Sequence, residues 1–316
     1  MNDFIFLEDI LKKPEFGNIV TDVHTIGKQV AVQTTKGLQI IPGYEVSDTL
    51  GHKILEERGL DSSETVAGRR IRVHVSRLGG EKCDLSIRVF PQSIRTLEEC
   101  DAPEDIVNLT GVRAGLIVVG GHTGSRKTTL VGGMIDKINT DRDAVIITVE
   151  DPVEIIHTPK RGIVRHKEIS KTLSWSDALR DLYRENADVL VIGETRDYEA
   201  INAALDLALS GKLVITTIHA SCVEDAIRQF IGRAPAEKAE IVANNLADAI
   251  TAVIVQRITL FRSFQREYMI FSKEDRQLIR DIKRVREIGT NLENKSRQNK
   301  PGYKVFPSEN ETVTKK

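Results

Sequence analysis

A strand, a glycine-containing loop and a helix follow one another between residues 116 and 139, and this order limits the fold more than any other feature of the chain. The apolar run 116–119 predicts a buried strand, and the stretch from Lys127 to Asn139 predicts a helix. The run Gly-His-Thr-Gly-Ser-Arg-Lys-Thr-Thr at 121–129 connects them. It has the length, first glycine, lysine and threonine of a phosphate-binding loop. The pattern predicts an anion site at a helix N-terminus.

Arg126 departs from this pattern, which has its second glycine directly before the lysine. Such a loop turns backbone N–H groups toward phosphates, its lysine reaches the β- and γ-phosphates, and the next hydroxyl holds Mg²⁺. A bulky residue forced to positive φ costs of order 1–3 kcal/mol, which a domain can offset elsewhere. The guanidinium of Arg126 either meets a phosphate or blocks the pocket. A chance near-match to the motif is the competing interpretation.

Length and composition indicate a cytoplasmic chain large enough for two domains. Lys and Arg number 45 against 46 Asp and Glu among 316 residues, so no global field attracts polyanions, which argues against nucleic acid as a partner. No apolar run approaches the ~20 residues of a membrane span. The N-terminus lacks a secretory signal, and the three separated cysteines suit a reducing compartment. We expect a protein with no integral membrane segment that reaches the membrane through partners.

The chain divides into two folded regions, a linker and a tail. Short strand-like runs between turns predict a small α+β domain with a mainly antiparallel sheet over 1–98. Prolines and acidic residues mark 99–114 as a linker with one short helix. Strands alternating with helices over 115–280 predict a parallel sheet, with a ligand at the carboxyl ends of its strands. Residues 281–316 hold nine basic and five acidic side chains, a difference of +4, and predict a flexible polar tail.

Ionisable residues follow three further predicted strands of the second region. Glu150 and His219 each come directly after an apolar strand, and Glu194 follows another after one glycine. Beside bound phosphates, an acid such as Glu194 orders Mg²⁺, a carboxylate such as Glu150 orients or deprotonates the attacking water, and a neutral imidazole senses phosphate. The structural alternatives are that buried strands often end in an acid and that a lone histidine is often structural. Glu150 with Asp151 and Glu154 also suits a solvated acidic turn.

Five sequence blocks, taken in order, resemble a known family. They are the loop at 121–129, Thr-Val-Glu-Asp-Pro-Val-Glu-Ile-Ile-His at 148–157, Val-Ile-Gly-Glu-Thr-Arg-Asp at 191–197, Leu-Val-Ile-Thr-Thr-Ile-His-Ala at 213–220 and Val-Ile-Val-Gln-Arg at 253–257. Over about residues 20–280 the chain closely resembles the secretion-superfamily ATPases, which drive type II secretion, type IV pilus extension and retraction, and type IV secretion. The first four blocks resemble that family's Walker A loop, Asp box, Walker B strand and His box.

The resemblance implies a RecA-like P-loop domain of the α/β class with a parallel sheet, preceded by a small α+β PAS-like domain. It implies ATP and Mg²⁺ as cofactors, with Glu150 and Glu194 as catalytic carboxylates and with Thr128 and Glu194 at the metal. The residues that it assigns to nucleotide binding are Gly121, Thr123, Gly124, Ser125, Lys127, Thr128, Thr129 and His219, together with Arg72 and Arg88 at subunit interfaces. Both arginines also suit ion pairs with surface acids. The choice between Glu150 and Glu154 as the carboxylate that activates water stays open.

For function, the resemblance implies a homo-hexameric ring that hydrolyses ATP and pushes an inner-membrane platform protein of a secretion, conjugation or type IV pilus machine. The chain lacks a four-cysteine zinc module, which places it nearest the retraction and type IVB or conjugation branches. The alternative is a nucleotide-binding ring subunit whose hydrolysis is impaired by Arg126 and which acts as a scaffold. A nucleic-acid translocase shares the fold class, but the near-neutral charge gives it little support.

Overall fold

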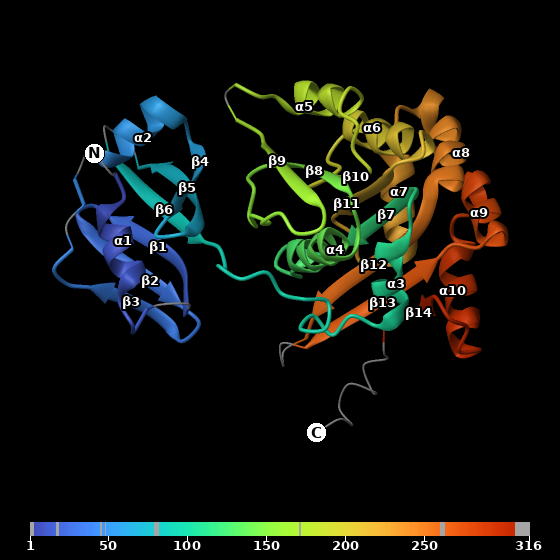
Figure 1. The fold of residues 1–316 in the computed structure, drawn as a ribbon, viewed down its shortest axis with the longest axis horizontal. Coiled ribbons are helices and arrows are strands. Elements are labelled where there is room, and N and C mark those ends of the chain that lie inside the picture. The colour runs from blue at the N-terminus through green and yellow to red at the C-terminus, as the bar shows by residue number, and fades with distance from the viewer. Residues whose placement is uncertain are drawn as a thin grey trace. The chain divides into compact units, whose positions relative to one another are not determined.

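The chain forms two compact units (Figure 1). The computed structural model describes residues 3–16, 19–44, 46–47, 49–78, 82–170, 172–259 and 263–306. The first unit comprises residues 1–94 with the short segments 151–156 and 168–174, and the second comprises the rest. The linker predicted at 99–114 therefore belongs to the second unit, and it contains one short α-helix, α3 (Glu104–Asn108).

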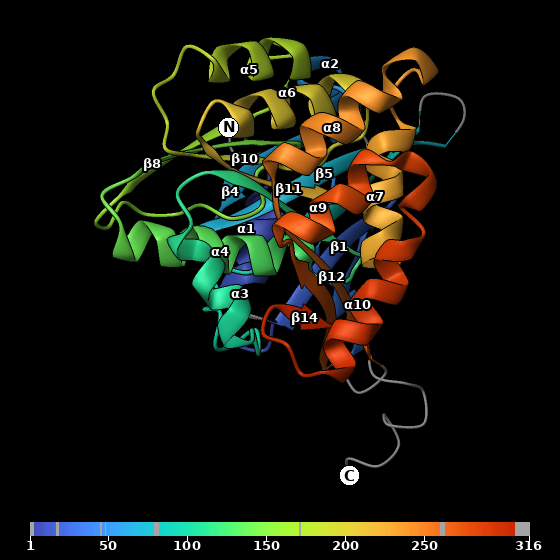
Figure 2. The same cartoon turned by 90° about the vertical axis from the view of Figure 1, so that its right-hand side faces the viewer.

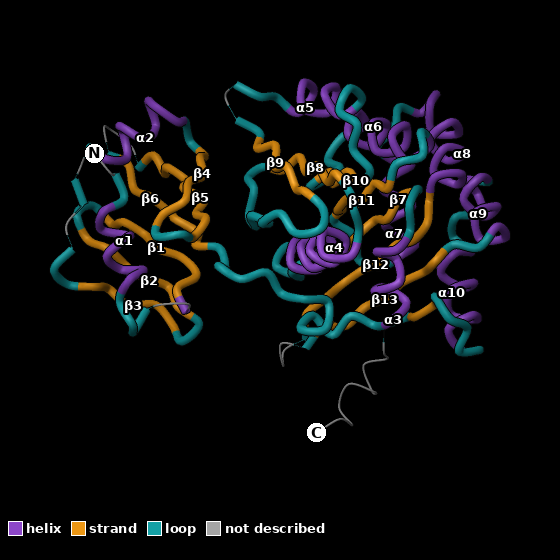
Figure 3. Tube along the Cα trace, in the orientation of Figure 1, coloured by secondary structure: helices purple, strands orange, loops and turns teal. Residues whose placement is uncertain are grey.

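An antiparallel sheet of six strands forms the centre of the first unit (Figure 3). Its order is β3-β2-β1-β6-β5-β4, with bounds β1 (Val20–Ile26), β2 (Gln29–Thr34), β3 (Gly37–Ile41), β4 (Asp61–Val66), β5 (Arg69–Arg77) and β6 (Cys83–Val89). Helices α1 (Ile5–Lys12) and α2 (Leu50–Arg58) bury Leu7, Ile10 and Ile54 in the same core as the strands. The α+β architecture predicted from the alternating runs is confirmed.

The second unit contains a sheet of eight strands with a parallel centre. Its order is β14-β13-β12-β7-β11-β10-β8-β9, with bounds β7 (Gly115–Gly120), β8 (Val145–Glu150), β9 (Ile163–Glu168), β10 (Val189–Ile192), β11 (Leu213–Ile218), β12 (Ile250–Ile258), β13 (Phe264–Ile270) and β14 (Tyr303–Lys304). Strands β12, β7, β11, β10 and β8 run parallel, whereas β13 and β14 are antiparallel additions. The predicted α/β fold with a parallel sheet is confirmed.

Helices cover this sheet and fix the ends of its strands. They are α4 (Lys127–Asp141), α5 (Trp175–Leu182), α6 (Tyr198–Leu209), α7 (Val223–Gly232), α8 (Ala239–Ala249), α9 (Lys273–Arg280) and α10 (Glu287–Arg297). Leu130, Met134 and Ile138 recur every four residues along α4 and pack with apolar side chains of the sheet. Helices α6, α8 and α9 lie side by side (Figure 2). Throughout the described ranges, every helix is too short or too polar to span a bilayer.

The prediction of a flexible tail over residues 281–316 is wrong for the described part of that segment, which ends at residue 306. Residues 287–297 form α10 and residues 303–304 add β14 to the sheet. Ile288 and Leu292, four positions apart, are wholly buried. The polar composition of the segment hid this helix from prediction. Only two apolar side chains anchor it, and hydrogen bonds of its polar side chains supply the other contacts. Residues 307–316 lie outside the described residues.

A buried carboxylate, Asp275, fastens the folded tail to α9. Its side chain is fully buried and lies 2.5 Å from the Lys295 ammonium, which is 14% exposed. The Tyr303 hydroxyl donates to it at 2.7 Å and the Asn291 amide at 2.6 Å. It also forms a reciprocal capping box with Ser272 at the start of α9. Burial opposes ionisation, but these hydrogen bonds prevail and lower the pKa of Asp275.

We predict that Asp275→Asn lowers the free energy of unfolding by about 3 kcal/mol, because it leaves the mostly buried Lys295 ammonium without its counterion. Since folding lowers the pKa of Asp275, its contribution is present above the ordinary carboxyl pKa of about 4 and is lost as the pH falls through the lower folded-state value. Thermal unfolding from pH 3 to pH 7 measures both effects. Glu287→Gln, in an exposed pair with Arg284, is the control, and we expect it to unfold at nearly the same temperature as the wild-type protein. Equal effects of the two variants would contradict the assignment.

Candidate functional site

The loop between β7 and α4 has a backbone that requires glycine at two positions. Gly121 has φ +149°, and a Cβ there would lie 2.4 Å from both the Gln256 carbonyl oxygen and the Ser125 hydroxyl. Gly124 has φ +79°, in the left-handed region. Thr123 is exposed at the tip of the loop, and Thr128 and Thr129 are half-buried in the first turn of α4. The loop therefore has the tight, glycine-dependent course that the motif predicts.

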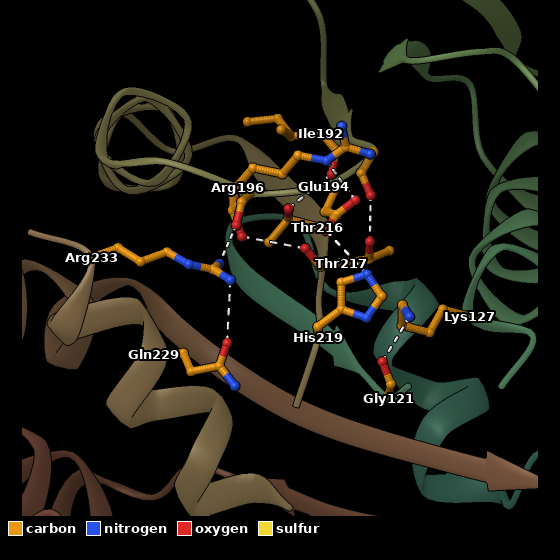
Figure 4. A network of polar contacts seen from close by, with 12 residues as sticks. Gly121, Lys127, Ile192, Glu194, Arg196, Thr216, Thr217, His219, Gln229 and Arg233 are labelled. Atoms are coloured by element: carbon orange, nitrogen blue, oxygen red, sulfur yellow. Dashed lines mark hydrogen bonds and ion pairs between the residues drawn. The ribbon is translucent and has the colours of Figure 1, made fainter. Parts of the chain in front are cut away.

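Three features of this loop fit an anionic ligand. Helix α4 begins at Lys127 without a side-chain hydrogen bond capping its first turn. The Lys127 ammonium donates to the carbonyls of Gly121 at 2.7 Å and His122 at 3.1 Å, which holds it over the loop (Figure 4). Within the described residues, the buried Ser125 hydroxyl has no hydrogen-bond partner. A helix N-terminus, an ammonium group and a hydroxyl all donate hydrogen bonds. Phosphate oxygens would accept them.

Arg126 adopts the left-handed conformation that its place in the motif demands, with φ +63° and ψ +38°. A non-glycine residue in this region costs of order 1–3 kcal/mol. Its guanidinium carbon lies 5.9 Å from the centroid of the Phe264 ring on β13. The guanidinium carbon of Arg266 also lies over this ring, at 4.9 Å. The side chain thus has an aromatic contact within its own unit, an arrangement that the sequence analysis did not anticipate.

A buried polar chain supports the loop from the neighbouring strands. The Gln256 amide on β12 donates to the carbonyls of Ser125 at 2.6 Å and Arg126 at 3.1 Å. Its oxygen accepts from the Arg266 guanidinium at 2.8 Å, and Arg266 also donates to the carbonyls of Cys100 and Asp101. Burial lowers the pKa of Arg266. Neither Gln256 nor Arg266 was predicted to have a role; a glutamine within an apolar strand was the available signal in the sequence.

Glu194 and His219, predicted from separate blocks, lie together at the ends of β10 and β11. The carboxylate of Glu194 lies 3.3 Å from the imidazole of His219 and accepts a hydrogen bond from Arg196 at 2.9 Å (Figure 4). The hydroxyl of Thr217 donates to the Gly193 carbonyl, which ties the two strand ends together.

Glu150 ends β8, the strand next to β10. A Cβ added to Gly193 would lie 3.4 Å from the Cα atom of Glu150, so the backbones that carry Glu150 and Glu194 are in contact range. The Glu150 carboxylate is 14% exposed and lies 3.5 Å from the imidazole of His166 on β9, a residue that the sequence analysis did not single out. Asp151 and Glu154, the neighbouring acids, fall in the segment that belongs to the first unit.

Arg72 and Arg88 lie in the first unit, opposite each other in the pairing of β5 and β6. Arg72 pairs with Asp61 and Arg88 pairs with Asp22, each at 3.3 Å. Their side chains are 41% and 64% exposed. The structure therefore shows them in surface ion pairs of their own sheet, and their assignment to nucleotide stays a prediction. Among the residues that the structure describes, no three His, Cys, Asp or Glu side chains form a metal cluster.

Residues 63–299 match the model of a family described as type II/IV secretion system protein. The chain belongs to this family. It is 35% identical over 201 residues to the type IV pilus retraction ATPase PilT of Pseudomonas aeruginosa, which covers 62% of this chain and 58% of that protein. It is also 35% identical over 202 residues to a twitching motility protein of Neisseria gonorrhoeae, covering 62% and 54%. The chain thus spans little more than half the length of these curated relatives.

Two solved structures have a similar fold. The pilus retraction motor PilT with bound ADP superposes with a TM-score of 0.80 at 28% identity, over 96% of this chain and 98% of that one. The ATPase DotB of Legionella pneumophila superposes with a TM-score of 0.77 at 24% identity, over 93% and 88%. The similarity to DotB concerns the fold alone.

We predict that Gln256→Leu destabilises the second unit by about 3 kcal/mol, because it leaves the carbonyls of Ser125 and Arg126 and a buried Arg266 donor unpaired. Thermal unfolding measures this loss. Gln265→Leu is the matched control on the same hairpin, since Gln265 bonds the exposed Arg257, and we expect less than about 0.5 kcal/mol from it. A Gln256 variant as stable as the control would contradict the support that we assign to this side chain.

Proposed function

We propose that the protein is a motor ATPase that hydrolyses ATP to drive a type IV secretion, conjugation or type IV pilus machine. The observation that carries this proposal is that the loop leading to Lys127 follows β7, while His219, Glu194 and Glu150 lie at the ends of β11, β10 and β8, the strands next to it in the sheet. In an α/β fold, ligands bind at this edge of the sheet. The family membership and the similarity to the retraction ATPase PilT support the same function.

The proposed roles follow from the chemistry of each group. Gly121, Thr123, Gly124, Ser125 and Thr129 would line the phosphate site together with the ammonium of Lys127, with the N–H groups of Gly121 and Ser125 already donating to the carbonyls of Ile218 and His122. Thr128 and Glu194 would hold Mg²⁺, which neutralises charge on the phosphates when bound. Glu150 would orient the attacking water, and His219 would sense the phosphate through its contact with Glu194. The two-unit division supports the proposal of a PAS-like domain before the P-loop domain.

The proposed function includes assembly of the chain into a homo-hexamer. A homo-hexamer would place Arg72 and Arg88 of one subunit against nucleotide held by another, where phosphate would replace Asp61 and Asp22 as their partner. Both pairs are exposed, so exchanging them costs little. The ring would act on an inner-membrane platform protein from the cytoplasmic side.

We predict that the wild-type protein releases phosphate from ATP in the presence of Mg²⁺. Lys127→Ala should weaken nucleotide binding about 10- to 100-fold, since an ionic hydrogen bond is lost. Glu150→Gln should keep nucleotide binding and lower kcat about 100-fold or more, since the amide cannot accept a proton. Titration with a fluorescent nucleotide and a phosphate-release assay separate the two effects. If Glu154→Gln abolishes turnover and Glu150→Gln does not, Glu154 is the catalytic carboxylate.

The same assay decides between the motor and a hydrolysis-impaired scaffold. We predict that Arg126→Gly changes kcat by less than about threefold, because arginine already adopts the conformation that glycine favours. Its guanidinium also has a partner in Phe264. A wild-type protein that binds ATP without releasing phosphate, together with an Arg126→Gly variant that releases it, would overturn the motor function and establish the scaffold.

A further inference from the structure

One nitrogen of His166, Nδ1, faces both a buried hydroxyl and the Glu150 carboxylate. His166 is on β9, the strand next to β8 and the last of the sheet as described. Its Nδ1 atom is 2.9 Å from the Thr148 hydroxyl and 3.5 Å from Oε1 of Glu150. On the other side of the ring, its Nε2 atom is 3.2 Å from the backbone nitrogen of His157. The imidazole is 10% exposed, so these contacts are its main polar environment.

These partners determine which nitrogen of His166 carries the proton. A backbone N–H can only donate, so the bond from the His157 amide requires a lone pair on Nε2 of His166. The proton of the neutral ring is therefore on Nδ1, which hydrogen-bonds the Thr148 hydroxyl and lies at the longer distance of 3.5 Å from Oε1 of Glu150. Thr148 has a hydroxyl that both donates and accepts, so it is compatible with this donor.

His157 reinforces the arrangement. Its ring stacks on that of His166, with centroids 5.5 Å apart and planes 21° apart. Its Nε2 atom is 3.1 Å from the Gly132 carbonyl and must donate to it, whereas its Nδ1 atom is buried with no partner in the described part of the chain. Burial lowers the pKa of His157, so this ring stays neutral and adds no positive charge beside His166.

We infer that His166 is a positioning residue for the Glu150 carboxylate, an inference that rests on the proposed function. Its Nδ1–H, fixed by the bond to the His157 amide, donates to the Thr148 hydroxyl at 2.9 Å and faces Oε1 of Glu150 at 3.5 Å, so the dipole of the ring orients the carboxylate and leaves Oε2 for the attacking water. A neutral donor suits this task, because it directs the carboxylate without cancelling the negative charge that attracts the water proton. In this role His166 acts through Glu150 and not on the reacting atoms.

The test compares two substitutions of His166. Asparagine places an amide donor where Nδ1 stands but has no atom at the Nε2 position, whereas leucine keeps the volume and has no donor. We expect His166→Leu to lower kcat about 10- to 100-fold, the scale on which a displaced catalytic group reduces rates, with KM for ATP and fluorescent-nucleotide affinity within twofold of wild type. His166→Asn should recover kcat to within about threefold of wild type.

The outcomes separate this inference from the proposed function. His166→Leu with wild-type kcat, or His166→Asn as slow as His166→Leu, overturns the positioning role while the ATPase stands. A parallel loss of nucleotide affinity and melting temperature in both variants assigns His166 a purely structural role and also overturns it. If leucine prevents folding, His166→Ala replaces it as the donor-free variant. A wild-type protein without phosphate release refutes the proposed function first.

Discussion

The left-handed backbone at Arg126 is the constraint on which the rest of the candidate site depends. It turns the chain from the loop into α4, and so it sets where Lys127 and the first-turn N–H groups lie. A residue with a side chain remains in this conformation only when its surroundings over-determine it. Gln256 supplies that determination by binding the carbonyls on both sides of the turn, and the Phe264 ring accommodates the guanidinium. Contacts from residues of β12 and β13 thus stabilise a backbone conformation that glycine would adopt without strain.

The order of the strands places the other candidate functional groups in a row beside this loop. β7 carries the loop, and β11, β10 and β8 follow it in the sheet with His219, Glu194 and Glu150 at their ends. Parallel pairing keeps all of these ends on one edge. The spacing between the groups is therefore set by the hydrogen bonds between the strands. These bonds must form because the strands are buried, and a buried backbone N–H or C=O group without a partner is costly. Side-chain contacts such as that between Glu194 and His219 then refine the positions.

The sequence predicted the parts of this site that depend on local pattern. The strand, loop and helix around Lys127 and the acid and histidine blocks are each contiguous, and periodicity was enough to place them. Gln256 and Arg266 escaped prediction because the backbone carbonyls that they bind are over 100 residues away in the chain, at Ser125 and Cys100. The tail was misassigned for a related reason, since its stability comes from Asp275, a carboxylate outside the segment. Long-range pairing of polar groups has no periodic signature.

The two polar clusters that flank the row of candidate functional groups differ in charge. Next to the β7–α4 loop, the buried guanidinium of Arg266 donates to Gln256 and to backbone carbonyls, which are neutral. Its hydrogen bonds are therefore satisfied without an anion, but its positive charge still attracts one. Next to Glu150, the contacts of His157 and His166 suit neutral rings. A second buried cation there would compete with bound water for the carboxylate and would itself be costly to desolvate. In the proposed ATPase, positive charge on the side of the loop would stabilise the nucleotide, and neutral donors on the side of Glu150 would leave the proposed base its negative charge.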